Sequence, residues 1–324
     1  MADPQPGETA GTTWLAGDIG ATNARFGLVA PAGAILHSST FACADFTDIG
    51  AAIGAYLAQR GTLAMPREGA LAIAAVITGD LVRMTNHPWH FSVAGLRDRL
   101  GFGRLLAIND FTAVALAVPR LSAADRMAVG GAAPVVGAPI AVLGPGSGLG
   151  ASGIVPSGSG WVPLTGEGGH ATMAPANERE DAVLRLMRRR FDHVSAERCL
   201  SGPGLVNLYN CLAELDGAPA EPWTAAQITD PETDDKLCRE ATAMFCAMLG
   251  TIAGNLALSL GARGGVYIAG GIVPRLGTRF VESGFRERFE AKGRMRPYLA
   301  TIPCYVVTHP LPAFLGCAAA LAAA

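Results

Sequence analysis

Two glycine-rich turns, each between a pair of apolar segments, restrict this chain more than any other feature. The first lies in TWLAGDIGATNARFGLVA (13–30) and the second in PIAVLGPGSGLGASGIVP (139–156). An apolar segment, a turn of small residues and a second apolar segment predict a β-hairpin. In each half, apolar runs of strand length then alternate with segments of helical periodicity. The sequence therefore predicts an α/β fold in two similar lobes with a cleft between them.

Apolar runs predict the remaining strands and helices of both halves. ALAIAAVITG (70–79) and LLAIND (105–110) read as strands covered on both faces, and FTAVALAV (111–118) continues as a helix. In the second half, 177–191 is predicted as a helix with Asn177 as N-cap and Glu180 at the third position. A long helix over 234–265, a strand at 265–271, another helix and a strand at 304–309 complete the pattern.

Composition limits the partners and the chemistry. The formal charge of −2 gives no electrostatic reason to expect nucleic acid or an anionic membrane. The chain has only two lysines, so phosphate chemistry has to use backbone N–H groups, arginine and a metal ion. Seven scattered cysteines without a C-x-x-C pair indicate buried, reduced thiols and no zinc site. The N-terminus lacks signal-peptide features, and 69–79 and 314–324, taken as the longest apolar runs, are too short to span a bilayer. We therefore expect a soluble, cytoplasmic protein.

The first glycine-rich turn has the composition of an anion site. Gly17, Gly20 and Ala21 are small enough for successive N–H groups to converge on a phosphate. Asp18 adds a carboxylate that could hold Mg²⁺ through water. A plain hairpin turn remains the alternative, because these residue types are common in turns.

The second turn contains GSGLGA (146–151), which matches a dinucleotide-binding fingerprint, with Glu167 about 20 residues further on. That fingerprint requires a helix directly after the glycines, whereas the subsequent sequence is strand-like. We therefore predict a second phosphate-binding hairpin turn; no G-x-x-x-x-G-K motif occurs. Gly270 and Gly271 follow a predicted strand and serve either close approach of a flat ligand or a tight turn.

Polar side chains suited to a polyol lie at the ends of predicted elements. They are Asn109, Asp110, Glu167, His170 and Glu197. Carboxylate and amide groups accept or donate to sugar hydroxyls. Asp110 follows a buried strand, where ligands bind in α/β sheets, and can act as a general base; its alternative role is the N-cap of the next helix. His87 and His90 lack a third ligand and are interpreted as a structural pair.

Taken together, the motifs resemble the bacterial glucokinase family, of the type distinct from ROK kinases, from about Trp14 onward. The motifs are GDIGATNAR, ITGD, MTNHPWHFS, INDFTAVA, GPGSGLG, GEGGH, HVSAERCLSGPGLVNLY, GNLALSLGARGGVYIAGGIVPR and FLGCAAAL. The wider superfamily comprises sugar kinases, actin and heat-shock chaperone ATPases. Its duplicated ribonuclease-H-like fold would account for the two hairpin-led halves. We expect a flexible tail at 1–12, a small domain of 13–119 with 311–324, and a large domain of 120–310.

The resemblance implies phosphorylation of D-glucose to glucose 6-phosphate by ATP with Mg²⁺, and a homodimer. Asp110 would be the catalytic base, and Asn109, Asp110, Glu167, His170 and Glu197 would bind glucose. The resemblance places ATP against Gly17, Asp18, Ile19, Gly20, Ala21, Thr22, Gly146, Ser147, Gly148, Gly270 and Gly271.

The sequence departs from the family at Ala21, which stands where a second glycine is frequent, and at Pro145 and Ser147. Alanine is tolerated at position 21 unless φ is positive there. No cysteine follows His170 before Cys199, so the zinc motif of ROK kinases is not expected. A kinase for another hexose, a non-catalytic ATP or sugar sensor, and an NAD-dependent oxidoreductase remain alternatives.

Overall fold

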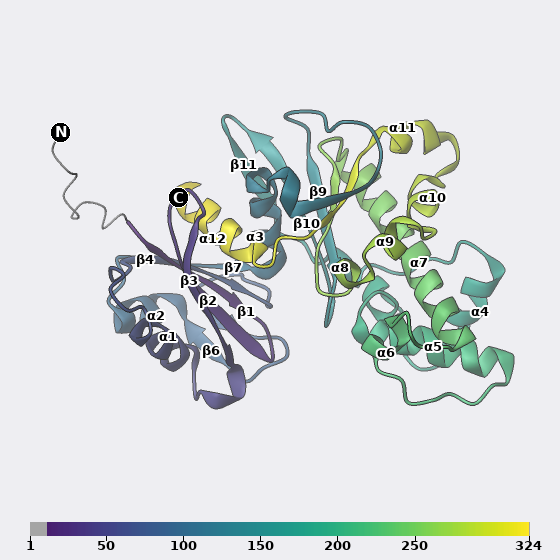
Figure 1. Ribbon diagram of the computed structural model, residues 1–324, viewed down its shortest axis with the longest axis horizontal. Coiled ribbons are helices and arrows are strands. Elements are labelled where there is room, and N and C mark those ends of the chain that lie inside the picture. Colours follow the sequence, from purple (N-terminus) through teal and green to yellow (C-terminus); the bar gives the residue numbers. More distant parts are fainter. Residues whose placement is uncertain (1–11, 324) are drawn as a thin grey trace, which may run out of the picture. The chain divides into compact units, whose positions relative to one another are not determined.

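The computed structural model describes residues 12–323, and its internal contacts divide the chain into two compact units (Figure 1). Unit 1 is Met1–Arg120 with Pro310–Ala324, and unit 2 is Leu121–His309. The expected tail at 1–12 lies outside the described residues except for its last position.

Unit 1 is built around a mixed sheet with the strand order β3-β2-β1-β4-β7. β1 and β2 form the predicted hairpin, with Gly17 opposite Phe26, and β4 and β7 run parallel to β1. The elements of unit 1 are β1 (Trp14–Ile19), β2 (Asn23–Val29), β3 (Ile35–Ala42), α1 (Ile49–Ala58), β4 (Glu68–Ile73), β5 (Leu81–Arg83), β6 (His90–Ser92), α2 (Val93–Leu100), β7 (Arg104–Asn109), α3 (Asp110–Ala117) and α12 (Pro312–Ala323).

Successive side chains of β1 and β4 point to opposite faces of this sheet, and the side chains on one face are larger than those on the other. Leu15 and Leu71 belong to the core formed with α1 and α2, whereas Ala16 and Ala70 belong to the core formed with α12. Small residues on the second face allow close packing. A Cβ on Gly316 of α12 would collide with the backbone of α3, so only glycine permits this contact.

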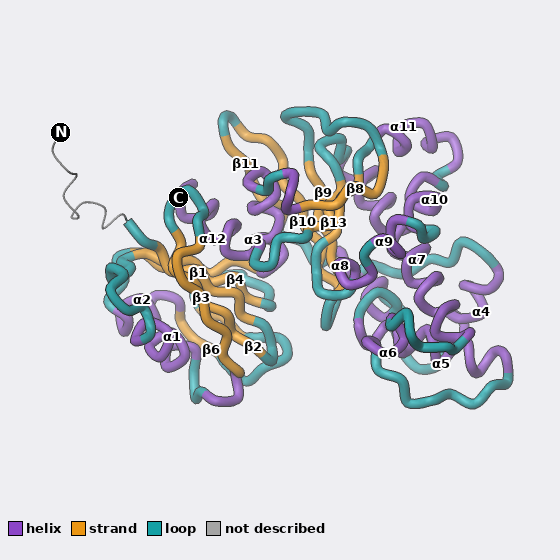
Figure 2. Tube along the Cα trace, in the orientation of Figure 1, coloured by secondary structure: helices purple, strands orange, loops and turns teal. Residues whose placement is uncertain are grey.

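Unit 2 contains a second mixed sheet with the order β11-β10-β9-β12-β13-β8, visible among the orange strands in Figure 2. β9 and β10 are antiparallel, and β12 and β13 run parallel to β9. The elements of unit 2 are β8 (Arg126–Gly130), β9 (Ile140–Pro145), β10 (Leu149–Ser157), β11 (Gly160–Leu164), α4 (Glu178–Met187), α5 (Gly202–Asp216), α6 (Ala225–Thr229), α7 (Lys236–Leu260), β12 (Val266–Ile268), α8 (Val273–Leu276), α9 (Thr278–Val281), α10 (Phe285–Glu290), α11 (Arg296–Thr301) and β13 (Cys304–Val307).

α7 is the long helix at the centre of this core. Gly254 of α7 contacts α10 closely, because a Cβ there would lie 2.6 Å from the carbonyl oxygen of Phe289. By length and composition α7 could cross a membrane, with a mean hydropathy of 1.7, so the expectation that 69–79 and 314–324 are the longest apolar segments is wrong. However, 56% of its most apolar stretch is buried in the unit, and a core helix meets the same criterion.

Several sequence predictions are confirmed. Both hairpins, the strands β4, β12 and β13, and the helices at 178–187 and 236–260 are present. A strand, not a helix, follows the second turn, which confirms the rejection of the dinucleotide fingerprint. All seven cysteines are buried free thiols. β7 is covered on both faces, with Leu105 and Ala107 in one core and Leu106 and Ile108 against the other, but it lies at the sheet edge and is less buried than predicted.

Candidate active site

The first turn, Gly20–Thr22, is fixed by the residue that follows β3. The backbone N–H of Cys43 donates to the Thr22 carbonyl at 2.8 Å, and its thiol lies 3.4 Å from the Gly20 carbonyl. The Gly20 N–H donates to Asn23 across the turn at 3.0 Å. Ala21 has no positive φ, as the sequence required for alanine there. These bonds occupy two carbonyls and one N–H of the turn.

Gly17, Asp18 and Ile19 lie within β1 and not in the turn itself. Gly17 is glycine for packing, since a Cβ there would come 2.6 Å from the Leu71 side chain. Asp18 pairs with Arg25 across the hairpin at 3.1 Å. Burial raises the pKa of this carboxyl, and the nearby Arg25 guanidinium opposes the shift.

Asn109 and Asp110 lie at the junction of β7 and α3. The Asn109 Oδ1 accepts hydrogen bonds from the N–H groups of Phe111 and Thr112 at 2.9 and 3.1 Å, so Asn109 is the N-cap of α3. Its Nδ2 donates to the Ala75 carbonyl at 3.3 Å. The alternative of Asp110 as N-cap is therefore wrong. Asp110 is the first helical residue, half-buried, and its Oδ1 is 2.9 Å from the Phe111 N–H.

The second turn, Gly146–Gly148, joins β9 to β10. The Gly146 N–H donates to the Gly148 carbonyl at 2.8 Å, and the Gly146 carbonyl accepts from Gly202 at the start of α5 at 2.8 Å. The next N–H, that of Leu149, donates to Glu197 Oε2 at 2.9 Å. The amides of Ser147 and Gly148, between these bonded positions, are those that the turn can present to an anion.

Three of the predicted sugar-binding residues meet beside this turn. Glu167 precedes the 3₁₀ helix Gly168–His170, and His170 is its last residue. The side chains of Glu167 and His170 lie 3.9 Å apart. The residue after His170 pairs with the residue before Glu197: the Ala196 N–H donates a hydrogen bond to the Ala171 carbonyl at 2.8 Å. Gly169 packs on the Leu149 carbonyl so closely that any Cβ there would collide. Unit 2 therefore joins Glu167, His170, Glu197 and the second turn into one cluster.

Gly270 and Gly271 follow β12 and reach the same turn. Gly270 has φ of +82° and lies against the carbonyl of Pro145, where a Cβ would collide. The Ala269 N–H donates to Leu143 of β9 at 2.8 Å. Packing on the strand that leads into the second turn therefore explains Gly270, whereas a Cβ on Gly271 would meet no neighbouring atom within 4 Å in the described part of the chain.

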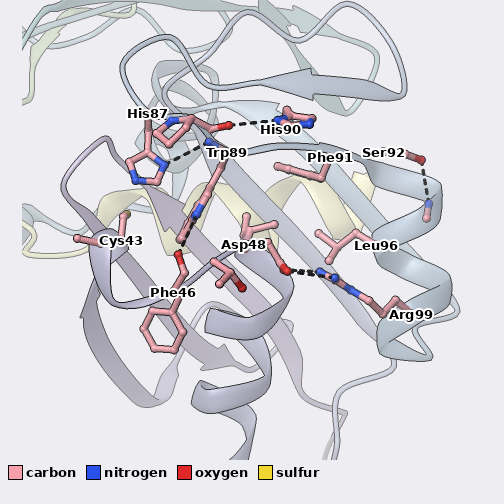
Figure 3. A pocket seen from close by; sticks show the side chains of 15 residues that line it. Cys43, Phe46, Asp48, His87, Trp89, His90, Phe91, Ser92, Leu96 and Arg99 are labelled. Carbon is pink, nitrogen blue, oxygen red and sulfur yellow. Dashed lines mark hydrogen bonds and ion pairs between the residues drawn. The ribbon is translucent and has the colours of Figure 1, made fainter.

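One cavity in each unit is relevant to these residues. One in unit 2, of about 450 Å³, is lined by His170 and Glu197 together with Arg190, Phe191, Asp192, His193, Ser195 and Arg198. Another in unit 1, of about 620 Å³, lies between the segment after β3, β6 and α2 (Figure 3). It contains none of the predicted site residues, although its wall residue Cys43 holds the first turn. His87 and His90 lie at its rim and bond to local backbone atoms, as expected of a structural pair.

Sequence reasoning missed the residues that hold the cluster together. Ser201 caps α5, accepting from the Gly204 N–H at 3.0 Å and donating to the Glu197 carbonyl at 2.8 Å. The sequence S-G-P-G, with proline in the first helical turn, carries the signal of such a cap. The contact of Glu197 with Leu149 spans 48 residues and has no local signal.

Solved structures place the fold in a class. A crystal structure of glucokinase from an Antarctic psychrotroph has a TM-score of 0.87 and 36% identity to this chain, covering 96% of it and 99% of that chain. The fold is accordingly that of a sugar kinase.

Sequence comparisons identify the family within that class. The profile of the Glucokinase family matches residues 15–324. A glucokinase of Paramagnetospirillum magneticum is 54% identical over 307 residues, covering 94% of this chain and 96% of that protein. A glucokinase of Aromatoleum aromaticum is 50% identical over 310 residues, covering 95% and 94%. The chain belongs to the glucokinase family.

Proposed function

We propose that this protein is a glucokinase that transfers the γ-phosphoryl group of ATP to D-glucose, giving glucose 6-phosphate and ADP. The observation that carries the proposal is the cluster in unit 2, where Glu197 bonds the glycine turn and lines a cavity with His170, whose side chain lies beside that of Glu167. Membership of the glucokinase family supports the same activity.

Asp110 is the proposed general base. A sugar hydroxyl is a poor nucleophile until its proton is removed, and a carboxylate at hydrogen-bonding distance can accept that proton. The proton of the glucose 6-hydroxyl passes to Asp110 as the new O–P bond forms, and the bond from the γ-phosphorus to ADP breaks. The cap made by Asn109 leaves Asp110 outside the capping role, which supports this assignment.

Glucose hydroxyls are bound, in this proposal, by Asn109, Asp110, Glu167, His170 and Glu197. Asn109 uses both lone-pair directions of Oδ1 on the α3 backbone, so its amide group Nδ2 is the part that can reach a hydroxyl. Glu167 and His170 have side chains that are 50% and 59% exposed, as a binding role requires.

ATP is proposed to lie against both turns. Gly20, Ala21 and Thr22 form the exposed part of the first, with Gly17, Asp18 and Ile19 supporting it from β1. The Ser147 and Gly148 amides form the second, while Gly146 closes that turn. Gly270 and Gly271 border the strand that leads to the second turn, and we propose that the adenosine lies beside them. Such fixed dipoles stabilise charge on a transferred phosphoryl group.

Mg²⁺ would be held through Asp18 and the ATP phosphates. Within residues 12–323 no group of three His, Cys, Asp or Glu side chains could hold a metal by itself. This fits Mg²⁺, which uses one or two carboxylates plus substrate phosphates. When bound, the ion would neutralise charge on the β- and γ-phosphates. Asp18 can share its carboxylate because it bonds a single arginine, Arg25.

Further parts of the family resemblance support the proposal. Both sheets contain a three-stranded antiparallel part followed by two parallel strands, to which unit 2 adds the antiparallel edge strand β8; the shared part supports a duplicated ribonuclease-H-like fold of the actin superfamily. We propose that unit 1 and unit 2 are the small and large domains. The assignment to the branch distinct from ROK kinases, the cytoplasmic location, the absence of zinc and the homodimer remain predictions; analytical ultracentrifugation tests the last of these.

A coupled turnover assay of the pure protein with Mg·ATP and a panel of hexoses tests the function. We expect sugar-dependent ADP formation, fastest with D-glucose. Faster turnover with mannose, fructose or glucosamine would reassign the substrate. ATP binding without sugar-dependent turnover would identify a sensor.

A further inference from the structure

The carboxylate of Glu197 lies between the cavity of unit 2 and the second turn. Its Oε2 accepts the Leu149 N–H at 2.9 Å and lies 2.5 Å from the position that a Cβ of residue 148 would occupy. The carboxylate therefore fills the space left by the missing side chain of Gly148. Glu197 also lines the cavity of about 450 Å³ with His170.

The two oxygens of this carboxylate have different surroundings. Among residues 12–323, the hydrogen bond to the Glu197 side chain is made at Oε2, by the turn. A carboxylate has about four lone-pair positions, so Oε1 keeps its capacity for a sugar hydroxyl. One side chain can thus contact the turn and a sugar at the same time.

The start of α5 holds both partners of this contact. The Ser201 hydroxyl, which is 2% exposed, donates to the Glu197 carbonyl at 2.8 Å. The adjacent Gly202 N–H donates to the Gly146 carbonyl at 2.8 Å. The start of α5 therefore fixes the Gly146 carbonyl, and Glu197 fixes the Leu149 N–H directly after the turn. The Ser147 and Gly148 amides lie between these two fixed points.

We propose that Glu197 is a positioning residue for the nucleotide phosphates in addition to binding the sugar, because its carboxylate fixes the second glycine turn. This inference rests on the proposed function for the identity of the ligands. It predicts that loss of the Glu197 carboxylate weakens nucleotide binding even when no sugar is present. A residue that contacts only the sugar would leave nucleotide binding unchanged under that condition.

Titration calorimetry with Mg·AMPPNP, without sugar, tests the proposal in Glu197→Ala and Glu197→Gln. Glu197→Ala loses a charge-assisted hydrogen bond to the Leu149 N–H and should therefore bind the nucleotide roughly tenfold more weakly or worse. Glu197→Gln should bind within about twofold of the wild type, because its amide oxygen can still accept the Leu149 N–H. Asp192→Ala is the matched control, since it removes a negative charge from the same cavity without a bond to the turn.

Hydrogen exchange of the Leu149 amide, read without any substrate, gives a second measurement. We expect roughly tenfold faster exchange in Glu197→Ala and wild-type exchange in Glu197→Gln and Asp192→Ala. Unchanged exchange or unchanged nucleotide affinity in a folded Glu197→Ala protein would overturn the proposal. If Glu197→Ala does not fold, faster exchange in Glu197→Asp, whose shorter side chain retracts the carboxylate, supports the proposal and unchanged exchange overturns it. If the exchange pattern is as expected but the protein shows no kinase turnover, the proposed function is rejected while the role of Glu197 in fixing the turn stands.

Discussion

The first turn is held in unit 1 by Cys43, whose N–H and thiol both lie on carbonyls of the turn. The second turn is held in unit 2 by Glu197, an acceptor on the Leu149 N–H, and by Gly202, a donor to the Gly146 carbonyl. Each turn joins the first hairpin of its sheet, and the two sheets share five strand positions, to which unit 2 adds β8 at the edge. Similar topologies therefore carry two different ways of fixing a glycine-rich turn, one of them from a residue that we propose to bind the sugar.

A second contrast lies in the segment after the last parallel strand of each sheet. In unit 1, β7 leads directly into α3 through Asn109 and Asp110. In unit 2, β13 ends at Val307, and the chain returns through Thr308 to unit 1 and α12. The topology repeats, but the proposed base is present in one unit alone. The division of chemistry between the units results from these local differences.

Asp110→Asn tests this contrast with the largest expected effect. We expect kcat to fall by at least roughly 10²-fold, because the amide cannot accept the proton, while the Asn109 cap keeps α3 intact. A coupled steady-state assay measures the loss, and circular dichroism checks the fold. Thr308→Ala, at the corresponding position after β13, should stay within about twofold of wild type. Near-normal turnover of Asp110→Asn would remove the assigned role.

Gly316→Ala tests the small-residue face that distinguishes unit 1. The added methyl group would collide with the Ala113 carbonyl of α3, so we expect a loss of about 1–3 kcal/mol in the free energy of unfolding. Gly54→Ala in α1 is the control. Among the described residues no atom lies within 4 Å of its new Cβ, and alanine should stabilise the helix by up to about 1 kcal/mol. Equal denaturation midpoints for the two variants would contradict this packing.

Gly148→Ala and Ala21→Gly compare the two turns directly. In the second turn the new methyl group would lie 2.5 Å from Glu197 Oε2 and displace the carboxylate. We expect kcat/KM to fall roughly tenfold, the equivalent of about 1.4 kcal/mol. Ala21→Gly removes a methyl group from a turn without positive φ at that residue and should change kcat/KM less than about twofold. Similar kinetics for both variants would mean that the turns are held alike.

The N-caps of α1 and α4 give the smallest expected effect, which is on thermal stability. The Arg99 hydrogen bond, with the backbone N–H groups of α1, holds the pKa of Asp48 below its usual value (Figure 3). Ionised Asp48 therefore stabilises the fold above its unfolded pKa of about 3.9, and this contribution is lost as pH falls through the lower folded value. In unit 2, α4 is capped by Asn177, which does not titrate.

Thermal unfolding between pH 7 and 3 separates these two caps. Asp48→Asn should lower Tm at neutral pH, and its deficit should shrink in acid. Asn177→Ser should show a deficit that is independent of pH. A constant deficit for Asp48→Asn would show that its charge makes no contribution.

The strands and hairpins could be predicted because their apolar runs and glycine turns are local. The strand after the second turn is evident from residues 152–156, and the helix cap at Asn177 from a three-residue pattern. Both depend on neighbours in sequence, which is where periodicity and capping rules apply.

The remainder depends on tertiary packing. Asn109 and Asp110 are both good caps, and only the start of α3 decides between them. The edge position of β7 results from strand order, which apolar content does not encode. The contact of Glu197 with Leu149 joins residues that are 48 positions apart. Sequence could therefore name candidate site residues but not which of them contact one another.

The packing of α12 has a consequence for the order in which the protein is completed on the ribosome. Phe314 of α12 fills the space above Gly27 of β2, and Cys317 and Leu321 join the same core as Trp14. All parts of unit 2 are translated before α12 emerges. The amino-terminal sheet, although it is made first, must therefore wait for the last-made helix before this face is fully covered.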